Sequence, residues 1–401
     1  MKHIIILCLS LFTISGYAQL ANLYPNDVGI ESDTNVLYVE KFDDGMTNIL
    51  GRYTDVLNSA GMSLDTDVPP GSLGPNSLKI TNVGGVNSGG HLYKKFTPGW
   101  DSTLYVRYYV KYPLISNGYI SHESVWLGGY YPATNWPNPQ AGTCGLGSSR
   151  MGISYEPVNE PAMDTYLYWG DMQSWNGGSS CYGNDMVNGS PTAQNLSWDQ
   201  WICVEIMVKL NNPVTAYNGE LRVWQNGVEV GYWGPGFPNG HWLVDSWINN
   251  PTDPPFPGFR WRTDANLKLN YIWIEYYDNM SPSSISRYIK YDHLVIAKKY
   301  IGPIQTGAGI GNNFLVDSIM QIYPNPSGGK TIIEFSLAGT SQVSIDIYNL
   351  LGEKVLAVEN GIFLSGKHTA VFDAKNLPAG TYFIKLLTPG YSLTKKIVIT
   401  K

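Results

Sequence analysis

Short segments of alternating apolar and polar residues fill most of this chain. Between residues 33 and 304 there are roughly ten or more of them, each bounded by turn-forming residues. In WICVEIMVKL, for example, Ile202, Val204 and Ile206 share one side, whereas Glu205 and Lys209 share the other. Because successive side chains of a strand point to opposite faces, this spacing predicts sheets with one buried face. So many short strands with irregular connections indicate a two-sheet sandwich of the jelly-roll type.

The composition agrees with an all-β protein and argues against some partners. Of the 401 residues, 43 are Gly and 25 are Pro, and only 14% are charged, which suits strands joined by turns better than helical bundles. The formal net charge of −6, with no run of Lys or Arg, argues against nucleic acid or an anionic membrane surface as the main partner.

The N-terminus predicts export. MKHIIILCLSLFTISGYAQ has a basic start, an apolar stretch too short to span a bilayer and a small-residue end, so residues 1–18 read as a signal peptide cleaved after Ala18. Cys8 lies inside the apolar stretch, which argues against a lipoprotein. No later segment is long and apolar enough to be transmembrane, so we expect a mature chain that is secreted or attached to the cell surface.

The chain also divides by composition. Residues 19–304 form the predicted jelly-roll domain, and the small and polar residues of 305–318 indicate a linker. Residues 319–401 contain about six further short alternating strands, which predict a second, small, immunoglobulin-like β-sandwich.

The motifs of this last segment resemble a known family. IYPNPSGG, VSIDIYNLLGEKV, LPAGTYFIKL and a final KKIVITK follow one another in the order seen in the type A sorting domain of the type IX secretion system of Bacteroidota. The resemblance implies passage through the outer membrane, with the type IX secretion machinery as a partner. From the residues alone, the same segment indicates only a small sandwich with turns at Asn325-Pro326 and Gly352.

Three cysteines remain after signal cleavage, and an exported chain permits a disulfide. Cys144 and Cys181 lie in Gly/Ser-rich loop sequence, whereas Cys203 lies inside a predicted strand. A Cys144–Cys181 bridge with Cys203 as a buried thiol is therefore favoured, although three cysteines allow three single pairings.

Aromatic residues indicate a glycan ligand. The chain has 13 Trp and 28 Tyr, and an aromatic face packs well against a sugar ring while an indole or phenol donates a hydrogen bond. For any single aromatic residue, packing in the core is the alternative. The candidate substrate-binding residues are Trp126, Trp169, Glu156, Arg262 and His241, with Trp136, Trp175, Trp233, Trp242 and Trp273 as further aromatic candidates.

Two neighbouring predicted strands suit the β-elimination of a uronic acid glycoside. This reaction needs a base for the proton α to the carboxylate, a proton donor for the leaving oxygen, and a group that offsets the carboxylate charge. Arg150 and Ser148 can bind the carboxylate, and Tyr166 and Tyr168 can serve as base and acid, since residues i and i+2 share a strand face. The carboxylate pattern Glu-x-Asp-x-x-Glu of a retaining glucanase is absent.

The same stretch resembles concanavalin A-like polysaccharide lyases of families 14 and 20, which cleave alginate or glucuronan. HESVWLGGYY followed by Ser-x-Arg and Tyr-x-Tyr carries the resemblance. It implies that Ser148 and Arg150 neutralise the carboxylate and that Tyr166 and Tyr168 transfer the proton. The family's lysine is missing, and His122 stands in this stretch instead. His122 can neutralise a carboxylate when charged or act as a base when neutral, and its alternative is a structural role.

One further expectation concerns a metal. EKFDDG and YDHLVIA belong to the first and last strands of the predicted jelly roll, which often pair. Asp43, Asp44 and Asp292 are thus candidate ligands of a structural Ca²⁺, and a plain Asp-Gly turn is the alternative. No cofactor is required for the chemistry. The function that we expect is a secreted polysaccharide lyase acting on a uronate-containing glycan, and the alternative is a non-catalytic glycan-binding or adhesion protein.

Overall fold

The computed structural model describes residues 19–113, 122–138, 141–145, 147–159, 162–175, 177–178, 180–187, 190, 193–279, 281–306, 320–337, 341–350, 352–364, 366–387 and 392–401. The predicted signal peptide and the predicted linker from residue 307 onward lie outside these residues. The chain divides into two compact units, Met1–Gly307 and Ala308–Lys401, each with its own hydrophobic core.

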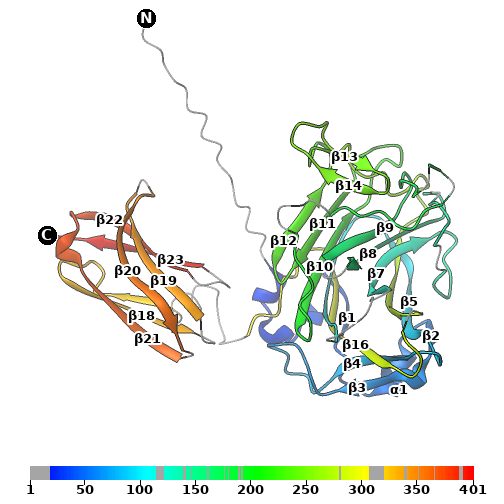
Figure 1. The fold of residues 1–401 in the computed structure, drawn as a ribbon, viewed down its shortest axis with the longest axis horizontal. Helices are drawn as coiled ribbons and strands as arrows, with labels where there is room; N and C mark the ends of the chain where they lie inside the picture. Colours follow the sequence, from blue (N-terminus) through cyan, green and yellow to red (C-terminus); the bar gives the residue numbers. More distant parts are fainter. Residues whose placement is uncertain are drawn as a thin grey trace, which may run out of the picture. The chain divides into compact units, whose positions relative to one another are not determined.

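The larger unit is a sandwich of two antiparallel sheets (Figure 1). The eight-stranded sheet has the order β12-β11-β10-β6-β16-β4-β3, with β1 also paired to β16, and the six-stranded sheet has the order β2-β5-β15-β7-β8-β9. The all-β jelly-roll prediction is confirmed. The strands of the first sheet are β1 (Val36–Glu40), β3 (Met62–Asp65), β4 (Ser77–Val83), β6 (Thr103–Lys111), β10 (Trp201–Lys209), β11 (Glu220–Gln225), β12 (Val228–Trp233) and β16 (Ser286–Ala297). Those of the second are β2 (Asp55–Leu57), β5 (Gly89–Trp100), β7 (His122–Tyr130), β8 (Arg150–Asn159), β9 (Ala162–Tyr168) and β15 (Leu269–Tyr277).

The remaining elements of this unit are short. They are the hairpin of β13 (Gly240–Leu243) and β14 (Ser246–Asn249), the helix α1 (Met46–Gly51), and the 3-10 turns η1 (Leu20–Asn22), η2 (Pro25–Asp27), η3 (Ile30–Ser32) and η4 (Ser59–Gly61).

The core between the two sheets follows from the alternation in the sequence. On β10, Ile202, Val204 and Ile206 are buried in this core. On β8, the core residues are Met151 and Ile153, together with Tyr155. Since every second residue enters the core, Arg150 and Gly152 lie on the opposite face of the six-stranded sheet. That face carries the cavity described below.

The outer face of the eight-stranded sheet is covered by the two ends of the unit. The carboxylate of Glu205 on β10 accepts hydrogen bonds from the backbone N–H groups of Ile301 and Gly302, at 2.7 and 2.8 Å. On β6, the buried Arg107 forms an ion pair with Asp27 of η2. Alternation places Glu205 on the polar face of β10, and the contacts with the two ends of the unit explain why it is nevertheless buried.

The smaller unit is a second sandwich, with sheets ordered β17-β18-β21 and β20-β19-β22-β23. The side chain of Asn325 fastens its start to β23, because it donates to the carbonyl of Lys396 and accepts from the N–H of Val398. None of the described helices is long and apolar enough to cross a membrane. The elements are β17 (Met320–Tyr323), β18 (Lys330–Leu337), β19 (Ser341–Tyr348), β20 (Lys354–Phe363), β21 (Gly366–Asp373), η5 (Ala374–Asn376), β22 (Gly380–Leu387) and β23 (Ser392–Ile399).

Candidate active site on the six-stranded sheet

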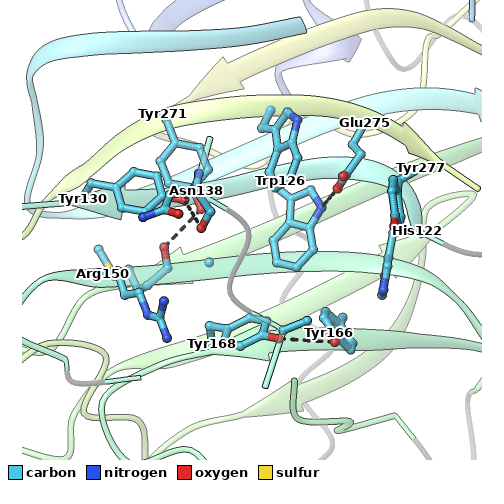
Figure 2. A pocket seen from close by; sticks show the side chains of 14 residues that line it. His122, Trp126, Tyr130, Asn138, Arg150, Tyr166, Tyr168, Tyr271, Glu275 and Tyr277 are labelled. Carbon is cyan, nitrogen blue, oxygen red and sulfur yellow. Dashed lines mark hydrogen bonds between the residues drawn. The ribbon is translucent and has the colours of Figure 1, made fainter. Parts of the chain in front are cut away.

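A cavity of about 290 Å³ lies on the face of the six-stranded sheet that points away from the core (Figure 2). The strand register brings its residues together in cross-strand rows. Trp273 of β15 faces Trp126 of β7, and Gly152 of β8 faces Tyr168 of β9. Paired residues on adjacent antiparallel strands share a face, so residues far apart in the sequence meet here. The lining residues are His122, Trp126, Tyr130, Asn138, Ala141, Arg150, Met151, Gly152, Tyr166, Tyr168, Tyr271, Trp273, Glu275 and Tyr277.

Stacked aromatic rings line the cavity. Trp126 and Trp273 stack with ring centroids 5.8 Å apart, and Tyr130 stacks on Tyr271 at 4.9 Å. The rings of Tyr166 and Trp126 meet edge to face at 5.8 Å. Such rigid aromatic surfaces suit the C–H faces of sugar rings.

Arg150 projects into the cavity from the first position of β8. Its Nη2 donates to the carbonyl oxygens of Thr143 at 2.7 Å and Cys144 at 3.2 Å, and its guanidinium lies 5.8 Å from the ring centre of Tyr168. Within the described part of the chain, no carboxylate forms a salt bridge with Arg150. A half-buried cation without an acidic partner is suited to bind an acidic ligand.

The two phenols expected from the sequence lie on the same wall of the cavity. The hydroxyl groups of Tyr166 and Tyr168 are 3.3 Å apart and form a hydrogen bond (Figure 2). Burial raises the pKa of both phenols, and for Tyr168 this rise is opposed by the hydrogen bond from Tyr166 and by the charge of Arg150. Tyr168 is therefore the phenol that loses its proton more easily.

His122 is an imidazolium at neutral pH. Its Nδ1 lies 2.7 Å from Oε1 of the buried Glu156, whose Oε2 accepts a hydrogen bond from Ser154 at 3.0 Å. Burial lowers the pKa of His122, but the facing Glu156 carboxylate outweighs this effect and raises the pKa to about 9. Of the two roles considered for His122, the charged one is thus favoured. Glu156 stabilises the His122 imidazolium but is not among the residues that line the cavity.

Glu275 was not selected as a site residue from the sequence. Its Oε2 accepts a hydrogen bond from Nε1 of Trp126 at 3.0 Å, inside the cavity. Burial, with the charge of Glu156 adding to it, raises the pKa of Glu275 to about 8, so this carboxyl group is mostly protonated at pH 7. Strand alternation could have identified Glu275, because it lies two residues from both Trp273 and Tyr277 and therefore shares their face of the strand.

A disulfide joins Cys144 to Cys181, with an S–S length of 2.08 Å, and Cys203 is a buried free thiol. The loop that contains Cys144 also supplies Ala141 to the cavity. Next to the bridge, the N–H of Gly142 donates to the carbonyl of Cys181 at 2.8 Å. The bridge therefore connects two loops at one side of the cavity.

Four other candidates are not brought to the cavity. Ser148 is exposed and precedes the start of β8, so it does not share a strand face with Arg150. Trp169 is buried in the core, where its indole donates to Asn184. Arg262 is buried and donates to the carbonyls of residues 265 and 267. His241, on β13, is exposed and pairs with Asp253. The burial of Trp169 and Arg262 is not visible in the sequence, because local alternation does not show which loops are covered.

The candidate metal ligands are only partly brought together. Asp44 forms a salt bridge with Arg52. Asp292 is buried, its Oδ2 has no hydrogen-bond partner, and burial together with the nearby charge of Asp43 raises its pKa. Among the described residues there is no cluster of three or more His, Cys, Asp or Glu side chains that could hold a metal ion. Asp43 and Asp292 remain as two oxygen donors that fit Ca²⁺ only if backbone carbonyls complete the site.

The smaller unit matches a family model described as a secretion system C-terminal sorting domain, over residues 321–400. The predicted sorting domain is thereby confirmed. The chain is exported by type IX secretion to a secreted or cell-surface location. No curated protein matches the chain in sequence.

Among solved structures, three similar ones are polysaccharide lyases. The alginate lyase Aly36B is 13% identical, with 67% of this chain and 97% of that chain covered and a TM-score of 0.41. The alginate lyase vAL-1 from Chlorella virus is 14% identical, with 66% and 100% covered and a TM-score of 0.41. The endo-β-1,4-glucuronan lyase from Trichoderma reesei is 11% identical, with 65% and 95% covered and a TM-score of 0.36.

Proposed function

We propose that this chain is a secreted polysaccharide lyase that cleaves a uronate-containing glycan by β-elimination. The observation that carries the proposal is the placement of Arg150, which has no acidic partner among the described residues, beside the hydrogen-bonded phenols of Tyr166 and Tyr168 in one aromatic cavity. Charge supports it as well. While Glu275 and both phenols are protonated, the two cations Arg150 and His122 exceed the one anion Glu156 by one charge, which matches one carboxylate.

Each reacting group has a distinct role in the proposed reaction. Arg150 and the His122 imidazolium offset the substrate carboxylate, which makes the hydrogen at C5 of the uronate more acidic. Tyr168, as phenolate, takes this proton, the C5–H electrons form the C4–C5 double bond, and the C4–O bond breaks. Tyr166 gives its proton to the leaving oxygen. A proton then passes from Tyr168 to Tyr166 along their hydrogen bond, which restores the starting state.

The assignment of the two phenols follows from their neighbours. Arg150 lies over the ring of Tyr168 and stabilises its phenolate, whereas Tyr166 packs against the His122 ring, with centroids 4.9 Å apart. Since burial raises both pKa values, the phenolate is a minor species at neutral pH. We therefore expect activity to increase toward alkaline pH.

The test is the appearance of unsaturated uronate, measured by its ultraviolet absorbance, when the exported chain is mixed with alginate, glucuronan or a neutral glucan. Arg150→Ala and Tyr168→Phe should each lower kcat/KM by at least about a hundredfold, as expected for loss of a charge-stabilising or acid–base group. Tyr217→Phe is the matched control, because this exposed phenol lies outside the cavity. Absorbance that persists at full rate in either site variant would contradict the proposal.

The stacked Trp126–Trp273 pair favours a second candidate function, glycan binding without cleavage. Retardation of an acidic glycan in affinity electrophoresis, with no unsaturated product from any substrate, would replace the lyase proposal by this one. Cleavage that yields saturated products and is lost in Glu275→Gln would instead indicate hydrolysis.

A further inference from the structure

We propose that the Cys144–Cys181 disulfide positions Arg150 for the proposed reaction and is therefore part of the machinery that recognises the carboxylate. This inference rests on the proposed function, because it concerns the group assigned to bind the substrate carboxylate. It makes Cys144 and Cys181 positioning residues, since neither is among the residues that line the cavity.

The guanidinium of Arg150 is oriented by backbone atoms. Nη2 donates to the carbonyl oxygens of Thr143 and Cys144, at 2.7 and 3.2 Å, and no side-chain oxygen among the described residues is a hydrogen-bond partner. An arginine side chain has many rotamers, so its direction depends on what its N–H groups bind. Here the direction depends on where residues 143 and 144 place their carbonyls.

Those two carbonyls belong to a loop that is not part of any strand. The loop is held from the side by the Cys144–Cys181 bond and by the hydrogen bond from Gly142 N–H to the Cys181 carbonyl. A further contact is the N–H of Gly145, 3.0 Å from the Met172 sulfur. Near Cys144 these noncovalent contacts are weaker than the covalent bond, and the other backbone hydrogen bonds of the loop, from Thr263 to Gly147 and from Tyr131 to Ser149, lie closer to β8.

The other half of the bridge is firmly anchored. Cys181 is fully buried. Three residues further on, Asn184 accepts hydrogen bonds from the Trp169 indole and the Gln173 N–H, both at 2.9 Å, and pairs through its backbone with Leu167 of β9. The disulfide thus links the segment paired with β9, which carries Tyr166 and Tyr168, to the loop whose carbonyls orient Arg150. It fixes the cation relative to the two phenols.

A double-mutant cycle tests this role. It compares wild type, Cys144→Ala with Cys181→Ala, Arg150→Ala, and the combination of all three, by kcat and KM on alginate and glucuronan. Loss of the bridge should raise KM and lower kcat/KM about tenfold or more in the presence of Arg150. In the Arg150→Ala background it should cost less than about twofold. Cys203→Ala, which removes the buried free thiol, should leave both constants unchanged.

The outcomes separate a positioning role from general stabilisation. Equal losses in both backgrounds would mean that the bridge only stabilises the fold, and unchanged kinetics without the bridge would overturn the inference equally. If the double alanine variant fails to fold, reduction of the folded wild type and reoxidation give the same comparison, with KM expected to rise and then recover. If oxidised wild type neither cleaves nor binds an acidic glycan, the proposed function fails; if it does and the bridge has no effect, only this inference fails.

Discussion

His122 shows how much a single neighbour decides. The residue is ambiguous in the sequence, because a histidine titrates close to neutral pH and serves as a base or as a cation. In the structure it faces Glu156 on β8, Glu275 and Tyr277 on β15, and Tyr166 on β9. The pKa of about 9 means that the positive charge is present below this pH and is lost as the pH rises through it.

This charge predicts that the alkaline rise of kcat/KM levels off near pH 9, because the Tyr168 phenolate becomes more abundant with pH while the His122 charge is lost. His122→Asn should lower activity at pH 7.5 about tenfold or more, since one of two charges facing the carboxylate is lost. His122→Lys should retain activity and move the pH at which the rise levels off upward, because an unperturbed lysine titrates near ~10.4.

The measurement is kcat/KM on a uronate polymer across neutral and alkaline pH, with thermal unfolding to check that each variant is folded. His241→Asn is the control, since this histidine also pairs with an aspartate but is exposed and lies outside the cavity. If the rise levels off at the same pH in His122→Lys as in wild type, another group is responsible for it.

At this scale the sequence alone identified Arg150, Tyr166, Tyr168 and His122 as candidates, and the structure brings all four into one cavity. The sequence alone could not identify the pairing of His122 with Glu156, because contact between residues 34 positions apart depends on the register of β7 and β8. Ser148 was placed on the strand face by counting i and i+2, but the strand begins only at Arg150.

At the scale of elements, β7 shows why two consecutive glycines lie within a strand. Gly128 and Gly129 both lie inside β7. A Cβ on Gly128 would lie 2.3 Å from the Tyr271 hydroxyl and 2.4 Å from the Met151 carbonyl. Strand alternation predicted β7 itself, but not this close approach, which depends on the neighbouring β15 and β8.

Gly128→Ala should therefore destabilise the larger unit. Overpacking of this kind costs about 1–3 kcal/mol of unfolding free energy, and one of the two clashes is with backbone, which moves less easily than a side chain. Gly51→Ala is the matched control, because nothing lies within 4 Å of its added Cβ. The measurement is the urea midpoint of the larger unit's transition. Equal midpoints for the two variants would show that β7 and β15 separate at little cost.

At the scale of the whole molecule, alternation was sufficient to predict two sandwiches, because each strand has one face in a core. The sequence did not show that the ends of the larger unit cover a sheet. Arg107 and Asp27, an ion pair 80 residues apart, become neighbours only when η2 packs on β6. The expected metal site lies close to this region, since the pKa of Asp292 responds to the charges of both Arg107 and Asp27.

We propose that Ca²⁺, if bound, uses Asp43 and Asp292 rather than Asp44. A Cβ on Gly74 would lie 2.4 Å from both carboxylate oxygens of Asp43, so only glycine leaves room for this carboxylate. Chelation by EDTA should lower the midpoint of thermal unfolding, and added Ca²⁺ should restore it, because a ligand of the folded state stabilises it by mass action. Asp292→Asn should abolish the response, whereas Asp44→Asn should not. An unchanged midpoint after chelation would show that no Ca²⁺ stabilises the fold.

The stacked indoles of Trp126 and Trp273 have an optical consequence. They are the two tryptophans among the residues that line the cavity, and the Trp126 N–H is bonded to a carboxyl group that titrates near pH 8. A ligand in the cavity would change the surroundings of these two rings, each 6% exposed, and alter their emission, whereas Trp233 and Trp261 do not line the cavity and would be unaffected. Intrinsic tryptophan fluorescence should therefore report ligand binding in the cavity, without a label and without turnover.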